Sequence, residues 1–240
     1  MSVAVEASGD ERKIVHGGGI GMSGRTGSTG MRTAVTGGER SFLPGMRHAW
    51  LLPLYDPFTK LAGAGAIHRR LVDQAGLRPG QRVLEIGCGT GNLLLAAKRA
   101  HPAALVVGLD PDLAALARAH RKARRRGLAV QLDRGHAEEL PYADDSVDVV
   151  LSSFMLHHVP AEQRDAAMRE VLRVLRPGGA LHLLDVGGSS DRGHHHRSTR
   201  EHAVDDVPDL LRRAGFREVT ETGTGAHRLV GRYAFYRATG

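Results

Sequence analysis

From residue 82 to residue 186 the chain alternates short apolar runs with longer stretches in which apolar residues recur every three or four positions. Continuous Val and Leu runs are typical of strands buried on both faces of a parallel sheet, and the longer period predicts helices that cover it. The predicted strands are RVLEIG (82–87), LVVGLD (105–110), VQLDRG (130–135), VDVVLSS (147–153) and ALHLLDV (180–186). The predicted helices are Asn92–His101, Leu113–Arg126, Ala161–Leu175 and Val207–Ala214. This alternation predicts an α/β fold with a Rossmann-like, doubly wound, mostly parallel sheet.

Two further predicted strands, Arg217–Glu221 and Arg228–Ala238, follow the last helix and complete a seven-stranded sheet. Because they are consecutive and the second alternates in its middle, we expect an antiparallel hairpin at the sheet edge. Residues 46–77 show helical spacing interrupted by prolines, which predicts an N-terminal helical cap on a core formed by residues 78–240.

Residues 1–45 consist mainly of Gly, Ser, Thr and charged residues without apolar periodicity, which predicts a disordered segment. The glycine-rich stretch Gly17–Gly30 raises the alternative of a phosphate-binding loop. That alternative is disfavoured because no predicted strand precedes the glycines and no Gly-Lys-Ser/Thr follows them.

Composition bears on the cellular location and the partners of the protein. Cys88 is the only cysteine, so no intramolecular disulfide can form, and we expect a reducing, cytoplasmic location without membrane insertion. The formal net charge of +7 would suit an acidic partner such as RNA. Much of this charge lies in the run Arg118–Arg126, which is interpreted as the solvated end of a helix.

The segment VLEIGCGTG (83–91) carries the central motif, in which an apolar strand leads into three glycines and a helix. Glycines at such a turn allow the backbone to approach a ligand closely. The spacing differs from the dinucleotide fingerprint, because the third glycine comes one residue early and Asn92 stands in its place, so a nicotinamide enzyme is disfavoured. Glu85, two residues before the first glycine, would favour a cationic ligand over a pyrophosphate.

Asp110 ends the second predicted strand, where a carboxylate can accept two hydrogen bonds from the hydroxyls of a ribose. Together, these motifs resemble class I S-adenosylmethionine-dependent methyltransferases, in particular the group of quinone-biosynthesis C-methyltransferases and methyltransferase type 11 domains, over residues 77–184. The resemblance implies S-adenosylmethionine as the cofactor, with its methionine portion on the glycine loop, its ribose on Asp110 and its adenine near Pro111. The loop residues that it assigns to the cofactor are Glu85, Gly87, Cys88, Gly89 and Gly91.

Three more segments extend the resemblance. GHAEELPYADDSVDVV (135–150) is similar to a family motif but has His136 where the family usually has an adenine-binding aspartate, so His136, Ala137 and Glu138 are the candidates there. SSFMLHHV (152–159) resembles the loop that lines the transfer pocket, with Ser152 at the cofactor, and LRPGGAL (175–181) resembles the turn into the fifth strand. In the cap, Tyr55 is a candidate for the cofactor carboxylate.

Methyl transfer needs a base only when the acceptor must lose a proton, and His157 or His158 could serve as one. Three consecutive histidines, His194–His196, rarely converge on one ion, so no metal site is predicted. The sequence therefore predicts methyl transfer to a carbon, oxygen or nitrogen of a small molecule. Two alternatives stay open: an RNA methyltransferase, although the chain shows neither an appended RNA-binding module nor an Asn/Asp-Pro-Pro-Phe/Tyr motif, and a cofactor-binding protein without transfer activity.

Overall fold

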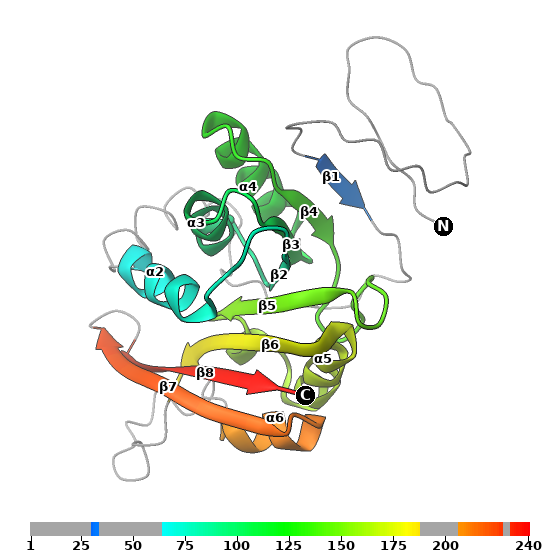
Figure 1. Ribbon diagram of the computed structural model, residues 1–240, viewed down its shortest axis with the longest axis vertical. Coiled ribbons are helices and arrows are strands. Elements are labelled where there is room, and N and C mark those ends of the chain that lie inside the picture. Colours follow the sequence, from blue (N-terminus) through cyan, green and yellow to red (C-terminus); the bar gives the residue numbers. More distant parts are fainter. Residues whose placement is uncertain (1–29, 34–63, 188–205, 228–230) are drawn as a thin grey trace.

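A single sheet organises the molecule in the computed structural model, which describes residues 30–33, 64–187, 206–227 and 231–240. Eight strands follow the order β1-β4-β3-β2-β5-β6-β8-β7 (Figure 1). Their bounds are β1 Gly30–Thr33, β2 Arg82–Ile86, β3 Leu105–Asp110, β4 Gln131–Arg134, β5 Val147–Ser153, β6 Leu175–Val186, β7 Glu218–His227 and β8 Gly231–Thr239. The strands from β1 to β6 pair in parallel, whereas β8 runs antiparallel to both β6 and β7. The predicted mostly parallel sheet with an antiparallel C-terminal hairpin is confirmed.

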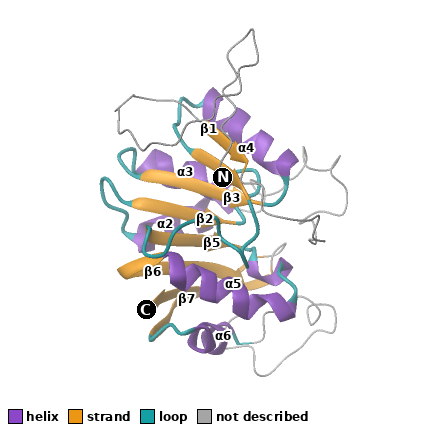
Figure 2. Cartoon of the chain, turned by 90° about the vertical axis from the view of Figure 1, so that its right-hand side faces the viewer, coloured by secondary structure: helices purple, strands orange, loops and turns teal. Residues whose placement is uncertain are grey.

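Helices cover both faces of this sheet (Figure 2). They are α2 Ala64–Ala75, α3 Asn92–Ala100, α4 Leu113–Arg125, α5 Ala161–Val174 and α6 Val207–Ala214, with a short 3-10 helix, η2, at Leu156–His158. On one face Leu71, Leu94 and Leu116 from α2, α3 and α4 pack on the sheet. On the other, Met168 of α5 and Leu211 of α6 do so. The predicted helices α3 to α6 are confirmed to within one residue at each end, because their apolar stripes face these two cores.

The N-terminal edge of the sheet corrects one prediction. Gly30–Thr33 lies in the segment predicted to be disordered, yet it forms β1 and pairs in parallel with β4. An edge strand can be held by backbone hydrogen bonds alone, and such bonds leave no apolar pattern in the sequence. The rest of residues 1–45, most of the predicted cap with Tyr55, and His194–His196 lie outside the described residues.

Two strands are longer than predicted. β6 begins at Leu175, so the predicted turn 175–179 belongs to the strand, and Leu175 pairs with Val147. β7 continues through its Gly/Thr-rich half to His227, past an irregularity between Glu221 and Gly223. In both cases pairing with a neighbouring strand overrides the loop-like composition.

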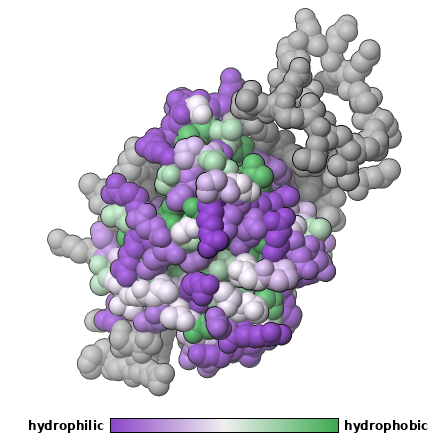
Figure 3. Space-filling model, viewed as in Figure 1, coloured by the Kyte–Doolittle hydropathy of each residue, from purple (hydrophilic) through white to green (hydrophobic). Residues whose placement is uncertain are grey.

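The outer surface is mostly polar on the face shown in Figure 3, where apolar residues appear as small separate areas. Among the described residues the large apolar side chains that remain exposed are Leu105 and Leu113. None of the described helices is both long enough and apolar enough to cross a membrane.

Candidate functional site

The glycine loop lies where the strand order changes direction, at the carboxyl end of β2 between β3 and β5 (Figure 1). This is the position at which open α/β sheets bind ligands. Gly87 and Gly89 have φ angles of +67° and +50°, which favour glycine. A Cβ atom at Gly87 would overlap the side chain of Met155, whereas no heavy atom lies within 4 Å of a Cβ built at Gly89. The loop is therefore closed against the β5 side at Gly87 and open at Gly89.

Glu85 is a carboxylate enclosed beneath this loop, with 3% of its surface exposed. It accepts a backbone hydrogen bond from Leu94 in the first turn of α3, while Oε2 has no partner among the described residues. Burial, and after it the charge of Asp110, raise the pKa of Glu85 well above its usual value, and Lys122 lowers it by less. An ionised Glu85 is thus penalised by its surroundings, and a neighbouring cation would relieve the penalty.

Asp110, at the carboxyl end of β3, holds the loop from the other side. Its Oδ2 accepts the N–H of Gly89 at 2.8 Å and its Oδ1 accepts the N–H of Asp112 at 2.9 Å. Burial raises the pKa of Asp110 to about 6, against the lowering effect of these two hydrogen bonds. A carboxylate offers about four acceptor directions, so about two stay available to the hydroxyls of a ligand.

Lys122 of α4 also reaches the loop. Its Nζ donates to Thr90 Oγ1 and to Asn92 Oδ1, each at 2.9 Å. The interpretation of the basic run as a solvated helix end is therefore wrong at this residue, although Arg121 and Arg124 are exposed. Helical periodicity placed Lys122 beside the buried face of α4 but gave no sign of its distant partners.

The candidates for the adenine lie next to Asp110. The charge of His136 acts on the pKa of Asp110, and the His136 backbone pairs with Glu139. His136 Nδ1 lies 3.7 Å from Glu138 Oε1, and both side chains are partly exposed. Ala137 packs against the core. The structure thus brings His136 near Asp110 at the carboxyl end of β3, and its role at the adenine stays a prediction.

Three predicted cofactor residues present no accessible side-chain group to a ligand. The Cys88 thiol is buried, with its Sγ 2.9 Å from a Cβ built at Gly108, and only the backbone of Cys88 belongs to the loop. A Cβ built at Gly91 would lie 2.9 Å from Ala119 Cβ, so Gly91 brings α3 close to α4. The Ser152 hydroxyl is fully enclosed and has no hydrogen-bond partner among the described residues. Alternation along buried strands and loops decided these orientations.

Beyond β5 the chain forms a second polar cluster, around Asp185 at the end of β6. The Asp185 carboxylate is fully buried and lies 2.6 Å, through Oδ1, from His157 Nδ1. It also accepts the N–H of Leu156 at 2.8 Å and that of Val186 at 2.7 Å. The ring of His158 lies against that of His157, with centroids 4.0 Å apart. Sequence reasoning missed Asp185, although an Asp directly after an apolar strand also identified Asp110.

α2 borders the same region. His68 Nε2 lies 3.1 Å from Ser153 Oγ, and burial lowers the pKa of His68 to about 4, so the imidazole is neutral near pH 7. Phe154, next to Ser153, has a φ angle of +52° and makes an edge-to-face contact with Tyr233. Phe154 and Tyr233 pack against the core on the face of the sheet that carries α2.

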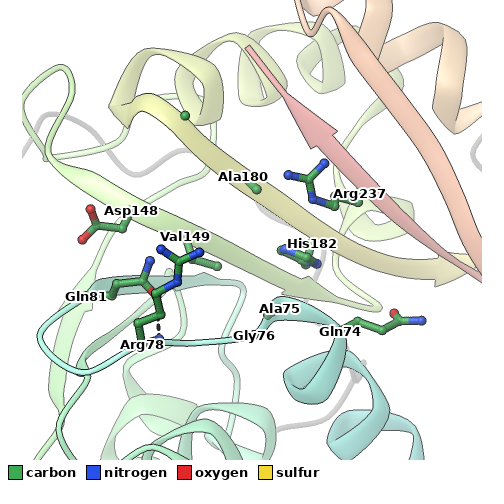
Figure 4. Close-up of a pocket in the computed structure, with 11 residues that line it drawn as sticks. Gln74, Ala75, Gly76, Arg78, Gln81, Asp148, Val149, Ala180, His182 and Arg237 are labelled. Atoms are coloured by element: carbon green, nitrogen blue, oxygen red, sulfur yellow. Dashed lines mark hydrogen bonds between the residues drawn. The ribbon is translucent and has the colours of Figure 1, made fainter.

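A polar pocket of about 150 Å³ lies at the opposite edge of the sheet, at the amino ends of β2, β5 and β6 (Figure 4). His182, Arg78, Arg237 and Asp148 are among its lining residues. None of the predicted cofactor residues lines it. The pocket lies at the amino ends of the strands, whereas the glycine loop follows the carboxyl end of β2. It is therefore separate from the candidate site.

The fold and the site define a Rossmann-like domain with a nucleotide-type crevice, in which two carboxylates flank the glycine loop. Residues 83–179 match the family model described as "Methyltransferase domain". A demethylmenaquinone methyltransferase of Thermus thermophilus is 38% identical over 138 residues, which are 56% of this chain and 62% of the relative. An uncharacterized protein of Mycobacterium tuberculosis is also 38% identical, over 114 residues, which are 48% of this chain and 40% of that protein.

A solved structure from Thermotoga maritima, titled a SAM-dependent methyltransferase and possible histamine N-methyltransferase, shares the fold with a TM-score of 0.58. It is 24% identical, and the match covers 80% of this chain and 99% of that one. Residues 83–179 thus match a methyltransferase domain, as the resemblance of the sequence to class I S-adenosylmethionine-dependent methyltransferases predicts. The chain spans between 40% and 62% of the length of the two curated relatives.

Proposed function

We propose that the protein transfers a methyl group from S-adenosylmethionine to a small-molecule acceptor. The observation that carries the proposal is the pair of carboxylates on the glycine loop. Glu85 keeps a buried oxygen without a partner, and Asp110 keeps acceptor directions beside the open position at Gly89. A cationic ligand with a ribose diol satisfies both, whereas a dinucleotide would bring its pyrophosphate against Glu85.

The residues present fit this cofactor, which supplies an electrophilic methyl group on a positively charged sulfur. Glu85 offsets the positive charge of the amino-acid portion, and Asp110 accepts the ribose hydroxyls. Pro111 and the segment His136–Glu138 border the adenine. Met155, packed against Gly87, keeps water from the side of the loop that faces β5. Methyl transfer then depends chiefly on holding two reactants in line.

A small acceptor agrees with the printed name of the Thermus relative, a demethylmenaquinone methyltransferase. The RNA alternative rests on the arginines at the end of α4. Arg124 and Arg125 are exposed in the last turn of α4, where cations also complement the helix dipole without any RNA partner. The proposal places the enzyme in the cytoplasm, where a chain whose only cysteine is buried needs no disulfide.

Calorimetric titration with S-adenosylmethionine, S-adenosylhomocysteine and NAD, in parallel, tests the proposal. We expect micromolar binding of the first two and no binding of NAD. Gly89→Val places a side chain in the open position and should weaken binding at least 100-fold. Gly127→Val is the matched control, because Gly127 also has a positive φ, +60°, and open surroundings but lies after α4, away from the loop. Binding of NAD alone, or normal binding by Gly89→Val, would reject the cofactor assignment.

A further inference from the structure

We propose that His157, held by Asp185, is the general base, and that the acceptor is therefore a molecule that becomes nucleophilic by losing a proton, such as a phenol or an enol. This inference rests on the proposed function. It assigns the role of base to His157 and not to its neighbour His158, and it makes Asp185 a positioning residue.

The contacts of Asp185 determine which nitrogen of His157 carries the proton. The carboxylate has no exposed surface and accepts two backbone N–H groups, from Leu156 and Val186. The carboxylate therefore acts as the acceptor in each of these contacts. At 2.6 Å the third contact therefore has Nδ1–H of His157 as donor. A neutral imidazole with its proton on Nδ1 presents the lone pair of Nε2 to an acceptor.

The fold brings His157 close to the glycine loop. β5 lies between β2 and β6 in the sheet, so the loop after β5 is flanked by the glycine loop and by Asp185. Met155 packs on Gly87, and Leu156, the next residue, is held by Asp185. A single residue, Leu156, thus separates the residue that contacts the glycine loop from His157. The 13% of the His157 side chain that stays exposed leaves the ring reachable.

Aromatic side chains at the carboxyl end of β5 and on β8, which pairs with β6, would suit a planar acceptor. Phe154 and Tyr233 meet edge to face, with ring centroids 6.2 Å apart, and Tyr233 meets Phe235 in the same way. Partly buried aromatic side chains at this end of the sheet offer apolar area to a ring that carries a hydroxyl group.

The chemical step balances as follows. The acceptor O–H bond breaks, and its proton goes to His157 Nε2. The oxygen electron pair forms the new bond to the methyl carbon, while the carbon–sulfur pair returns to sulfur. The products are the methylated acceptor, neutral S-adenosylhomocysteine and an imidazolium ion, stabilised by Asp185 until it releases its proton to water.

Three variants of the full chain test the roles: His157→Gln, Asp185→Asn and His158→Gln. Each is titrated with S-adenosylhomocysteine and then assayed with S-adenosylmethionine on a panel of phenols, enols, primary amines and thiols. We expect turnover on phenols or enols that falls about 10²- to 10⁴-fold in His157→Gln, the range for a lost general base. Asp185→Asn should lower turnover about 10²-fold or more at unchanged cofactor affinity, because the wrong tautomer becomes populated. His158→Gln, the matched control, should stay within a few-fold of the native protein.

A spectroscopic signature is independent of turnover. Nitrogen-15 NMR of the histidine rings should show His157 as the Nδ1–H tautomer in the native protein and in His158→Gln, and as a mixture in Asp185→Asn. An Nε2–H tautomer in the native protein, turnover confined to amines and thiols, or turnover on no member of the panel while the cofactor binds would overturn the inference. Loss of cofactor binding in the native protein would instead defeat the proposed function.

Discussion

Asp110 and Asp185 end two strands of the same sheet and show the same local pattern, an apolar run that stops at an aspartate. Each accepts two backbone N–H groups, but their exposure differs. Asp110 is partly exposed and its pKa is raised to about 6. Asp185 is fully enclosed and accepts a third hydrogen bond, from His157. One carboxylate thus keeps capacity for a ligand, whereas the other is occupied within the protein.

The neighbours of the two strands explain the difference. β3 ends beside the glycine loop, and within the described part of the chain Gly89 and Asp112 donate hydrogen bonds to the carboxylate of Asp110. β6 ends between β5 and β8, so Leu156 from the loop after β5 and Val186 from its own strand both reach Asp185. The same sequence pattern therefore serves ligand binding at one strand end and the anchoring of a loop at another.

The largest expected difference between the two aspartates concerns the stability that each contributes to the fold. Asp185→Ala leaves enclosed N–H groups without an acceptor and should lower the free energy of unfolding by about 3 kcal/mol. Asp110→Ala should lower it by about 1 kcal/mol or less, because water can reach the freed donors. Urea denaturation of both variants measures the difference. Equal losses would show that the two aspartates are equivalent.

For cofactor affinity the order of the two effects should be reversed, with the larger loss at Asp110. Asp110→Ala should weaken the binding of S-adenosylhomocysteine by about 2 to 3 kcal/mol, the scale for losing hydrogen bonds to a charged group. Asp185→Asn should leave the affinity within about threefold, since Asp185 faces His157. Calorimetric titration of the two variants decides. An unchanged affinity for Asp110→Ala would remove Asp110 from the ribose site.

The pH dependence follows from the pKa of Asp110. Because the pKa of Asp110 is raised to about 6, the ionised acceptor is lost below that pH, and affinity should fall about tenfold per pH unit between pH 6 and 5. The stability contribution has the opposite sign: the folded state keeps the Asp110 proton at pH values where the unfolded state has released it, so stability falls as pH rises from about 4 to 6. Asp110→Asn should flatten both trends, measured by titration and by urea denaturation across this range.

The smallest effect concerns the anchor on the other side of the loop. Lys122→Ala removes donors to Thr90 and Asn92 and should cost about 1 kcal/mol of stability with a few-fold loss of cofactor affinity. Arg124→Ala, on the exposed side of the same helix, is the matched control and should change neither by more than about 0.5 kcal/mol. Equal effects in thermal melts would mean that Lys122 only adds to the charge of α4.

Much of this arrangement is encoded in local patterns of the sequence. The period of apolar residues determined α3 to α6 and the central strands, since that period reports directly which side chains face a core. The glycine spacing with Glu85 and Asp110 predicted the crevice and the match to a methyltransferase domain, because close backbone approach and strand-end carboxylates are local requirements.

Tertiary structure decided what depends on contacts between distant segments. Pairing with β4 made a strand of Gly30–Thr33, and pairing with β8 extended β7 through glycines and threonines. The contact of His157 with Asp185 joins residues 28 positions apart, which meet because β6 lies beside β5. Lys122 likewise meets partners 30 and 32 residues away. A polar side chain carries no periodic signal of its partner, so only the packed sheet determines which polar groups meet.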